Sequence, residues 1–189
     1  MISKKIKGVE IIKNLIISLM SIVLTLSFSF VAKANYTSEE FQKTYFEIGY
    51  KEIHEALKEC NKHFMENIGL PIQLPPVPFS HSFGRCNKLG GEVNHSFEIE
   101  YLHMGQPKNH YMIRVHPVKY GLPIRKEHID QALKLKDRSK AVYATKIVRG
   151  FNLLVFEKNG FQYVLSVDKR ISDKVTSKIL MEIANSVTK

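Results

Sequence analysis

The longest periodic run of apolar residues begins just after residue 37 and predicts a long helix. Its apolar side chains recur at spacings of three and four residues, which places them on one helical face. They are Phe46, Tyr50, Ile53, Leu57, Cys60 and Phe64. Thr37 and Glu40 fit a capping box at its start, and Gly69 followed by Pro71 marks its end. We expect this helix to dock on a sheet of the same chain, because the apolar stripe is narrow and short.

A proline-rich segment follows and predicts an extended connector. Residues 71–79 contain four prolines, a composition typical of polyproline-like backbone. Leu74, Val77 and Phe79 lie among them, so we expect the segment to lie on the domain.

From residue 81 onward the apolar pattern takes the two-residue period of strands. Residues 97–103 and 111–117 alternate on either side of a turn at 105–109, which predicts an antiparallel pair. One face of the first strand carries Glu98 and Glu100. Alternating glutamates on a strand usually form its solvated face, and we expect the same here.

A meander and a closing helix complete the pattern. Strands are predicted at 141–147, 151–157 and 161–167, and Asn159-Gly160 supplies a strong hairpin signal. Residues 120–136 fit a short helix or the start of a strand. The closing helix is expected from about residue 173 to 187, with Ser172 as its cap. The predicted fold class is α+β: an antiparallel sheet, hairpin plus meander, packed by a long N-terminal helix and a C-terminal helix.

The first 34 residues have the pattern of a secretory signal peptide. Lysines at the start precede an uncharged apolar stretch at 14–32, and Ala32-Lys33-Ala34 provides small residues where a signal peptidase cleaves. The alternative is an uncleaved anchor with residues 14–32 as a transmembrane helix, since 19 uncharged residues nearly suffice to span a bilayer. Both alternatives place residues 35–189 outside the cytoplasm, as a single extracytoplasmic domain.

Charge and composition narrow the function only slightly. Residues 1–34 hold five lysines and one glutamate, a net +4, which leaves +6 of the total +10 for residues 35–189. This charge suits an anionic cell-wall polymer, a lipid surface or an acidic protein partner. Nucleic acid is disfavoured, because the lysines and arginines are scattered and form no basic stripe with interleaved aromatics.

Two cysteines and eight histidines raise competing possibilities. Cys60 and Cys86 both lie in the exported part, where one disulfide is the simplest interpretation. Two buried free thiols are the alternative. Together with His63 and His81 the cysteines have the composition of a zinc site but not its spacing.

Catalytic motifs are missing from the sequence. It has no Gly-x-Ser-x-Gly elbow, no His-Glu-x-x-His, no Ser-x-x-Lys and no phosphate-binding Gly-rich loop. An exported hydrolase or metal-dependent enzyme would have to use a cluster of His103, His110 and His116, or Glu98 and Glu100 as a glycosidase pair. Five arginines are possible clamps for an anion if the fold brings them together. They are Arg85, Arg114, Arg125, Arg149 and Arg170.

The second half of the chain shows a family resemblance through its structural motifs. They are Leu74-Pro-Pro-Val-Pro-Phe79, Phe97–Tyr101, Leu153–Phe156, Asn159-Gly160, Tyr163–Leu165 and Ile179–Ser186. Over roughly residues 70–189 the chain resembles the domain of unknown function found in small secreted bacterial lipoproteins and in extracytoplasmic parts of membrane-bound anti-sigma regulators. That family has no agreed catalytic residues, so the resemblance assigns none here. The chain lacks a lipoprotein cysteine and a cytoplasmic sigma-binding segment, so no anti-sigma role is implied.

These observations favour a secreted or surface-held, non-enzymatic protein of the bacterial envelope. We expect it to bind a protein partner or an anionic wall component through the exposed face of its sheet, without a cofactor. The two alternatives are the exported histidine enzyme and the membrane-anchored envelope protein.

Overall fold

The computed structural model describes residues 37–88 and 90–188. The expected signal peptide, and with it the alternative membrane helix at 14–32, lies outside these residues. Within the described part, no helix has the length and apolar character needed to cross a membrane.

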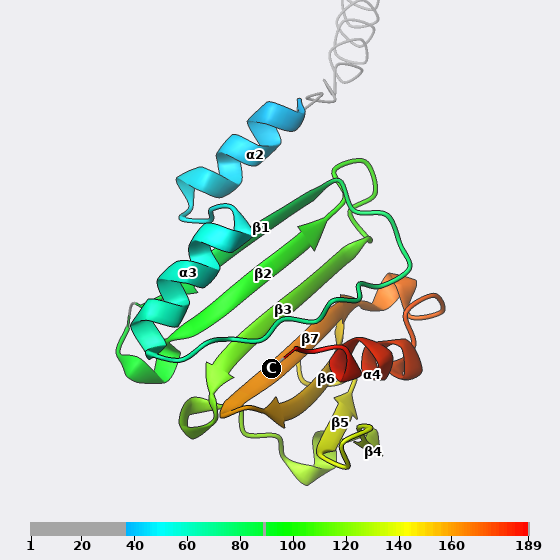
Figure 1. Ribbon diagram of the computed structural model, residues 1–189. Coiled ribbons are helices and arrows are strands. Elements are labelled where there is room, and N and C mark those ends of the chain that lie inside the picture. Colours follow the sequence, from blue (N-terminus) through cyan, green and yellow to red (C-terminus); the bar gives the residue numbers. More distant parts are fainter. Residues whose placement is uncertain (1–36, 89, 189) are drawn as a thin grey trace, which may run out of the picture. The chain divides into compact units, whose positions relative to one another are not determined.

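A seven-stranded antiparallel sheet forms the body of the domain (Figure 1), which confirms the α+β class. The strands in chain order are β1 (His81–Asn87), β2 (Ser96–Leu102), β3 (His110–Pro117), β4 (Gln131–Lys134), β5 (Lys140–Ala144), β6 (Phe151–Lys158) and β7 (Phe161–Asp168). Their order across the sheet is β1-β2-β3-β7-β6-β5-β4. The predicted hairpin and meander are therefore joined through the β3–β7 pairing into one sheet.

Three helices lie in the described part of the chain: α2 (Ser38–Glu47), α3 (Ile53–Phe64) and α4 (Ser177–Asn185). α3 and α4 cover the same face of the sheet, and the segment between α3 and β1 crosses that face beside them (Figure 1). This segment is anchored to the end of the chain by a bridge between Pro71 and Val187. Val77 and Phe79 pack against the core as expected, whereas Leu74 is exposed.

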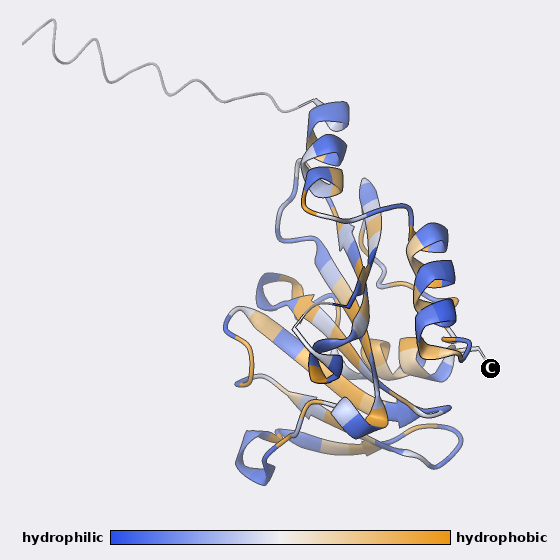
Figure 2. Cartoon of the chain, turned by 90° about the vertical axis from the view of Figure 1, so that its left-hand side faces the viewer, coloured by the Kyte–Doolittle hydropathy of each residue, from blue (hydrophilic) through white to orange (hydrophobic). Residues whose placement is uncertain are grey.

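The core lies between this face of the sheet and the two helices. It contains the inward side chains of β2, β3 and β7, such as Phe97, Ile113 and Leu165, together with Cys60 of α3 and Ile183 of α4. The ribbon of α3 alternates between hydrophilic and hydrophobic positions (Figure 2), as expected for a helix with one buried face.

The long N-terminal helix that we predicted is wrong, because the chain breaks between α2 and α3. Gly49 has a φ of +92°, a left-handed conformation that glycine adopts without strain. Lys51 then pairs with Gly84 of the edge strand through two backbone hydrogen bonds of 2.8 Å. The predicted capping box is present at Thr37 and Glu40, but it caps only the first of the two helices.

The break lets α2 and α3 contact opposite faces of β1. A Cβ atom added to Gly84 would meet Ile53 and Ala56 of α3 at 2.9 Å, so α3 lies close against this side of the strand. The next residue toward the N-terminus, Phe83, points to the other side and stacks on Tyr45 of α2 with ring centroids 4.4 Å apart. The apolar stripe seen in the sequence is therefore divided between the two faces of the sheet.

Two boundaries also differ from the prediction. α4 begins at Ser177 and is capped by the Thr176 side chain rather than by Ser172, because a 3-10 turn at Lys169–Ile171 precedes it. The ambiguous segment 120–136 resolves into a 3-10 turn at Lys126–His128 followed by β4.

Candidate functional site

The face of the sheet opposite α3 and α4 carries buried carboxylates that we expected to be solvated. Glu98 is 1% exposed and Glu100 is 8% exposed, so the expectation of a solvated face is wrong. A buried carboxylate is costly unless cations or hydrogen-bond donors compensate it. The neighbouring strands supply that compensation.

Strand register sets Glu98 between two arginines. Glu98 on β2 is directly opposite Arg85 on β1 and Arg114 on β3. Arg85 Nη2 donates to Glu98 Oε1 at 2.8 Å, and Arg114 donates to Oε2 through both Nε, at 2.8 Å, and Nη2. Tyr50 donates its hydroxyl to Oε1, and Arg85 stacks over the Tyr50 ring at 4.3 Å.

These contacts keep the Glu98 carboxyl ionised. Burial alone would raise the pKa of Glu98, but Arg114, the Tyr50 hydroxyl and Arg85 outweigh it and lower the pKa below its ordinary value of 4.5. Burial, followed by the hydrogen bond to Glu98, raises the pKa of Tyr50, which therefore stays a neutral donor.

Glu98 and Glu100 do not form a glycosidase pair. Tyr50 also contacts Glu100 Oε1 at 3.3 Å, and the other oxygen of Glu100 is hydrogen-bonded to His110. A general acid needs a raised pKa, whereas the pKa of Glu98 is lowered. Glu98 acts instead as the buried counter-ion of Arg85 and Arg114.

An open groove of about 540 Å³ lies over this charged row. Arg85 and Arg114 form part of its lining, with 31% and 43% of their side-chain surface exposed. Its other lining residues are Ile48, Gly49, Cys86, Asn87, Lys88, Val93, Asn94, Ser96, Glu98 and His116. The groove therefore presents guanidinium, ammonium and amide groups, while its only carboxylate is buried and already paired.

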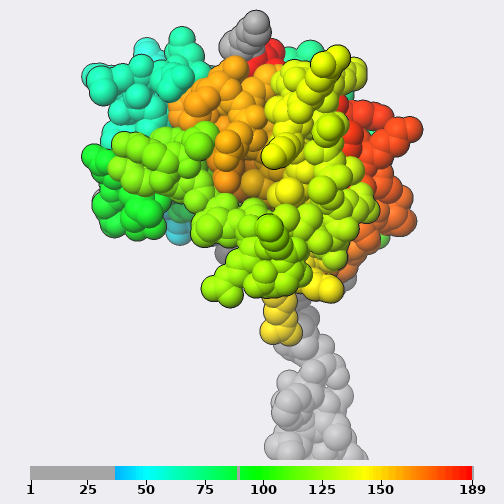
Figure 3. All heavy atoms as spheres, turned by 90° about the horizontal axis from the view of Figure 1, so that it is seen from below, coloured from blue at the N-terminus to red at the C-terminus, as the bar shows by residue number. Residues whose placement is uncertain are grey.

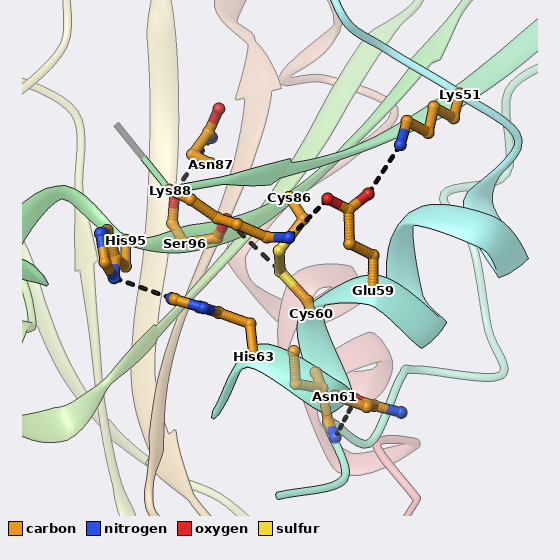
Figure 4. Close-up of a disulfide and its surroundings, with 11 residues drawn as sticks. Lys51, Glu59, Cys60, Asn61, His63, Cys86, Asn87, Lys88, His95 and Ser96 are labelled. Atoms are coloured by element: carbon orange, nitrogen blue, oxygen red, sulfur yellow. Dashed lines mark hydrogen bonds and ion pairs between the residues drawn. A yellow bond between two sulfur atoms is a disulfide. The ribbon is translucent and has the colours of Figure 1, made fainter. Parts of the chain in front are cut away.

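A second cation-rich cluster, drawn in Figure 4, includes Lys88 from the lining of the groove. Glu59 of α3 accepts from Lys51 at 2.7 Å and from Lys88 at 2.5 Å. Two cations thus share one carboxylate here, as they do at Glu98.

The disulfide predicted between Cys60 and Cys86 is present (Figure 4), with an S–S distance of 2.06 Å. It ties α3 to β1 directly behind the groove. Both thiols are consumed, so the zinc set of Cys60, His63, His81 and Cys86 is not formed. His81 instead bonds with Ser80 and Ser38 at 2.7 and 2.9 Å.

The histidine cluster expected for an enzyme is also not formed. His103 lies in the turn after β2 and accepts a hydrogen bond from Gly105 N. His110 and His116 lie six residues apart on β3, which is about 20 Å along a strand. Burial, followed by nearby Arg114, lowers the pKa of His116. Among the described residues, no three His, Cys, Asp or Glu side chains are arranged to hold a metal ion.

Three residues of the charged row, Arg85, Glu98 and Arg114, are candidates from the sequence alone, whereas Tyr50 is not. Arg85 and Arg114 were among the five arginines, whereas Arg170 pairs with Asp168 and Arg125 is within 3.9 Å of Glu127. Tyr50 was assigned to the core face of a helix, and its polar role depends on the break at Gly49. Arginines and a glutamate on neighbouring strands were visible in the sequence. That they lie directly opposite one another follows only from the strand register.

Comparisons with known proteins place no further constraint on the site. No family model, no curated protein and no solved structure matches this chain. The resemblance to the domain of secreted lipoproteins and anti-sigma regulators therefore stays a prediction.

Proposed function

We propose that this chain is an exported, non-enzymatic protein of the bacterial envelope that binds an anionic cell-wall component in the groove over Arg85 and Arg114. The observation that carries the proposal is the pairing of two partly exposed arginines with a single buried carboxylate. One carboxylate cannot neutralise both guanidinium groups, and each has further N–H donors available to a ligand. Phosphate or carboxylate groups match the planar arginine fork.

The setting of the arginines favours binding over catalysis. Their orientation is fixed by Glu98, and α3 is held behind them by the Cys60–Cys86 disulfide. The Glu98 carboxylate is ionised and hydrogen-bonded, so it is a poor proton donor. Such a site is suited to holding an anion in place without transforming it.

Export supports the same proposal. The signal-like residues 1–34 and the disulfide suit an oxidising compartment outside the cytoplasm, where an anionic wall component would be accessible. In the membrane-held alternative, residues 14–32 stay attached and the domain presents the same groove from the membrane surface. A protein partner with an acidic patch is the second candidate, because its carboxylates would pair with the same arginines.

The test measures the binding of soluble polyglycerol phosphate to the exported, oxidised protein. Calorimetry at two salt concentrations gives the affinity. We expect saturable binding that weakens with salt, because phosphate contacts with arginine are electrostatic. Arg114→Gln should reduce the affinity strongly. Arg125→Gln removes the same charge from an exposed arginine outside the groove, and it should leave the affinity close to that of the wild type.

Equal losses in the two variants would show that net charge, rather than the groove, attracts the polymer. If Arg114→Gln does not fold, Lys88→Gln on the groove rim provides the second variant, with Lys43→Gln on α2 as its control. An absence of binding to the phosphate polymer together with saturable binding to poly-glutamate would favour the acidic protein partner.

A further inference from the structure

Two histidines that are far apart in the sequence meet beside the groove. His63 is in the last turn of α3 and His95 follows the 3-10 turn Glu92–Asn94. The Nε2 atom of His63 lies 2.8 Å from the Nδ1 atom of His95, and the two rings are tilted by 62° (Figure 4). The disulfide one turn earlier on α3, at Cys60, fixes the position from which His63 projects.

The pair lines a separate pocket whose charge differs from that of the groove. This pocket has a volume of about 320 Å³, and its lining includes His63, His95, Glu66, Glu92 and Lys119. The end of α3 and the segments near residues 92–95 and 117–120 lie side by side at this surface (Figure 3). Two carboxylates and one lysine contribute a net charge of −1, so the pocket favours a cation.

We propose that His63 and His95 form a binding site for a divalent transition-metal ion, with Cu²⁺ bound most tightly. Imidazole nitrogen is a preferred ligand of copper and zinc, and copper stands highest in the usual order of affinities. The proposal concerns a ligand and a pocket different from those of the anion groove, and it does not depend on anion binding.

The spacing of the two nitrogens already fits the ion. Cu²⁺ prefers square-planar or tetragonal coordination, and metal–nitrogen bonds of about 2.0 Å at a right angle place two neighbouring nitrogens about 2.8 Å apart. The observed distance is 2.8 Å, so the rings need only turn until both lone pairs face the ion. Since no third protein ligand converges on this point among the described residues, water molecules complete the coordination.

Binding requires a tautomer change but no net loss of a proton. In the hydrogen-bonded pair of neutral rings, one of the two facing nitrogens carries a hydrogen. When the ion binds, both facing nitrogens donate lone pairs, and that hydrogen moves to the other nitrogen of its own ring.

The test is titration of the exported, oxidised protein with CuSO₄ in a weakly chelating buffer near pH 7.5. We expect one tightly bound Cu²⁺ per chain by calorimetry and coupling to imidazole nitrogens in the copper EPR spectrum. His63→Gln and His95→Gln each keep a polar partner for the remaining ring, and each should abolish this binding. His54→Gln is the matched control, because His54 is an exposed residue of the same helix, and it should bind copper as the wild type does.

Two results would overturn the proposal. The first is a wild-type EPR spectrum without imidazole coupling, a measurement that needs no variant to fold. The second is copper uptake that is the same in the wild type and in folded His63→Gln. Arg114 does not line the histidine pocket, so the Arg114→Gln variant should still bind copper. The copper test can therefore fail or succeed independently of the anion-binding test.

Discussion

At the scale of single residues, the most informative group is the Glu98 carboxylate. It is almost fully buried, yet it remains ionised because two guanidinium groups and a phenol donate to it. Removing one partner of such a cluster costs more than the net contribution of the pair, since it leaves the remaining charges without compensation. Glu98 thus holds together two arginines that would otherwise repel each other.

We expect Glu98→Gln to lower the free energy of unfolding by about 2 kcal/mol at pH 7, in the range of a hydrogen bond to a charged group. The pKa of Glu98 is lower in the folded protein than in the unfolded chain. Its contribution to stability is therefore complete above its ordinary value of 4.5 and is lost as the pH falls through the lower, folded value. Urea unfolding of wild type and variant from pH 7 to pH 3 measures both effects.

The two stability curves should converge in acid, because protonation of Glu98 removes the same charge as the substitution. Glu127→Gln is the control, since Glu127 is exposed and lies 3.9 Å from Arg125, and it should change stability very little. A constant difference between wild type and Glu98→Gln over the whole pH range would contradict the assigned ionisation.

The residues of the site could be named from the sequence, but their arrangement could not. Arg85, Glu98 and Arg114 are visible as charged residues, and Glu98 alternates with apolar neighbours as a solvent-facing residue would. Whether Glu98 is solvated depends on what covers the face of the sheet opposite α3 and α4. Here that cover includes Tyr50, whose position follows from a chain break that the apolar period does not reveal.

At the scale of elements, the strands were easier to predict than the helices. The two-residue period and the Asn159-Gly160 turn identified the hairpin and the meander, because register and facing are set locally in such units. The stripe from Phe46 to Phe64 kept a helical period across Gly49, although the chain leaves the helix there. Period alone cannot show that two halves of one stripe pack on opposite sides of an edge strand.

This division makes α2 dependent on a small aromatic cluster. None of the residues of α2 is buried, and its Phe41 and Tyr45 pack against Phe83, which is 2% exposed. We expect Phe83→Ala to destabilise α2 selectively, because it removes the side chain on which this helix rests. Hydrogen exchange measured by mass spectrometry should show faster exchange in residues 38–47 and little change in β6 and β7.

Phe64→Ala provides the matched control for this prediction. Phe64 packs against the main core on the other face and contacts Phe161 with ring centroids 5.8 Å apart. Its removal should speed exchange in α3 and leave α2 close to the wild type. If Phe83→Ala left exchange in residues 38–47 unchanged, the docking of α2 on β1 would be wrong.

At the scale of the whole molecule, the main core and the proposed binding row lie on opposite faces of the sheet. One face of the sheet carries α3, α4 and the main core, and the other carries the row of Arg85, Glu98 and Arg114. The disulfide joins α3, on the core face, to β1, which carries Arg85. The disulfide suits the proposed location outside the cytoplasm, because disulfides persist in oxidising compartments.

The export proposal leads to a mass that can be predicted. Protein recovered from outside the cells should begin at Asn35 and end at Lys189, with an intact mass two hydrogens below that of the reduced chain, because Cys60 and Cys86 are joined. Alkylation without reductant should add nothing, and alkylation after reduction should add two groups.

A full-length mass would instead support the alternative in which residues 14–32 anchor the protein, while leaving the groove and the histidine pair unchanged. Two thiols that react without reductant would remove the clamp between α3 and β1, and with it the rigid position from which His63 reaches His95.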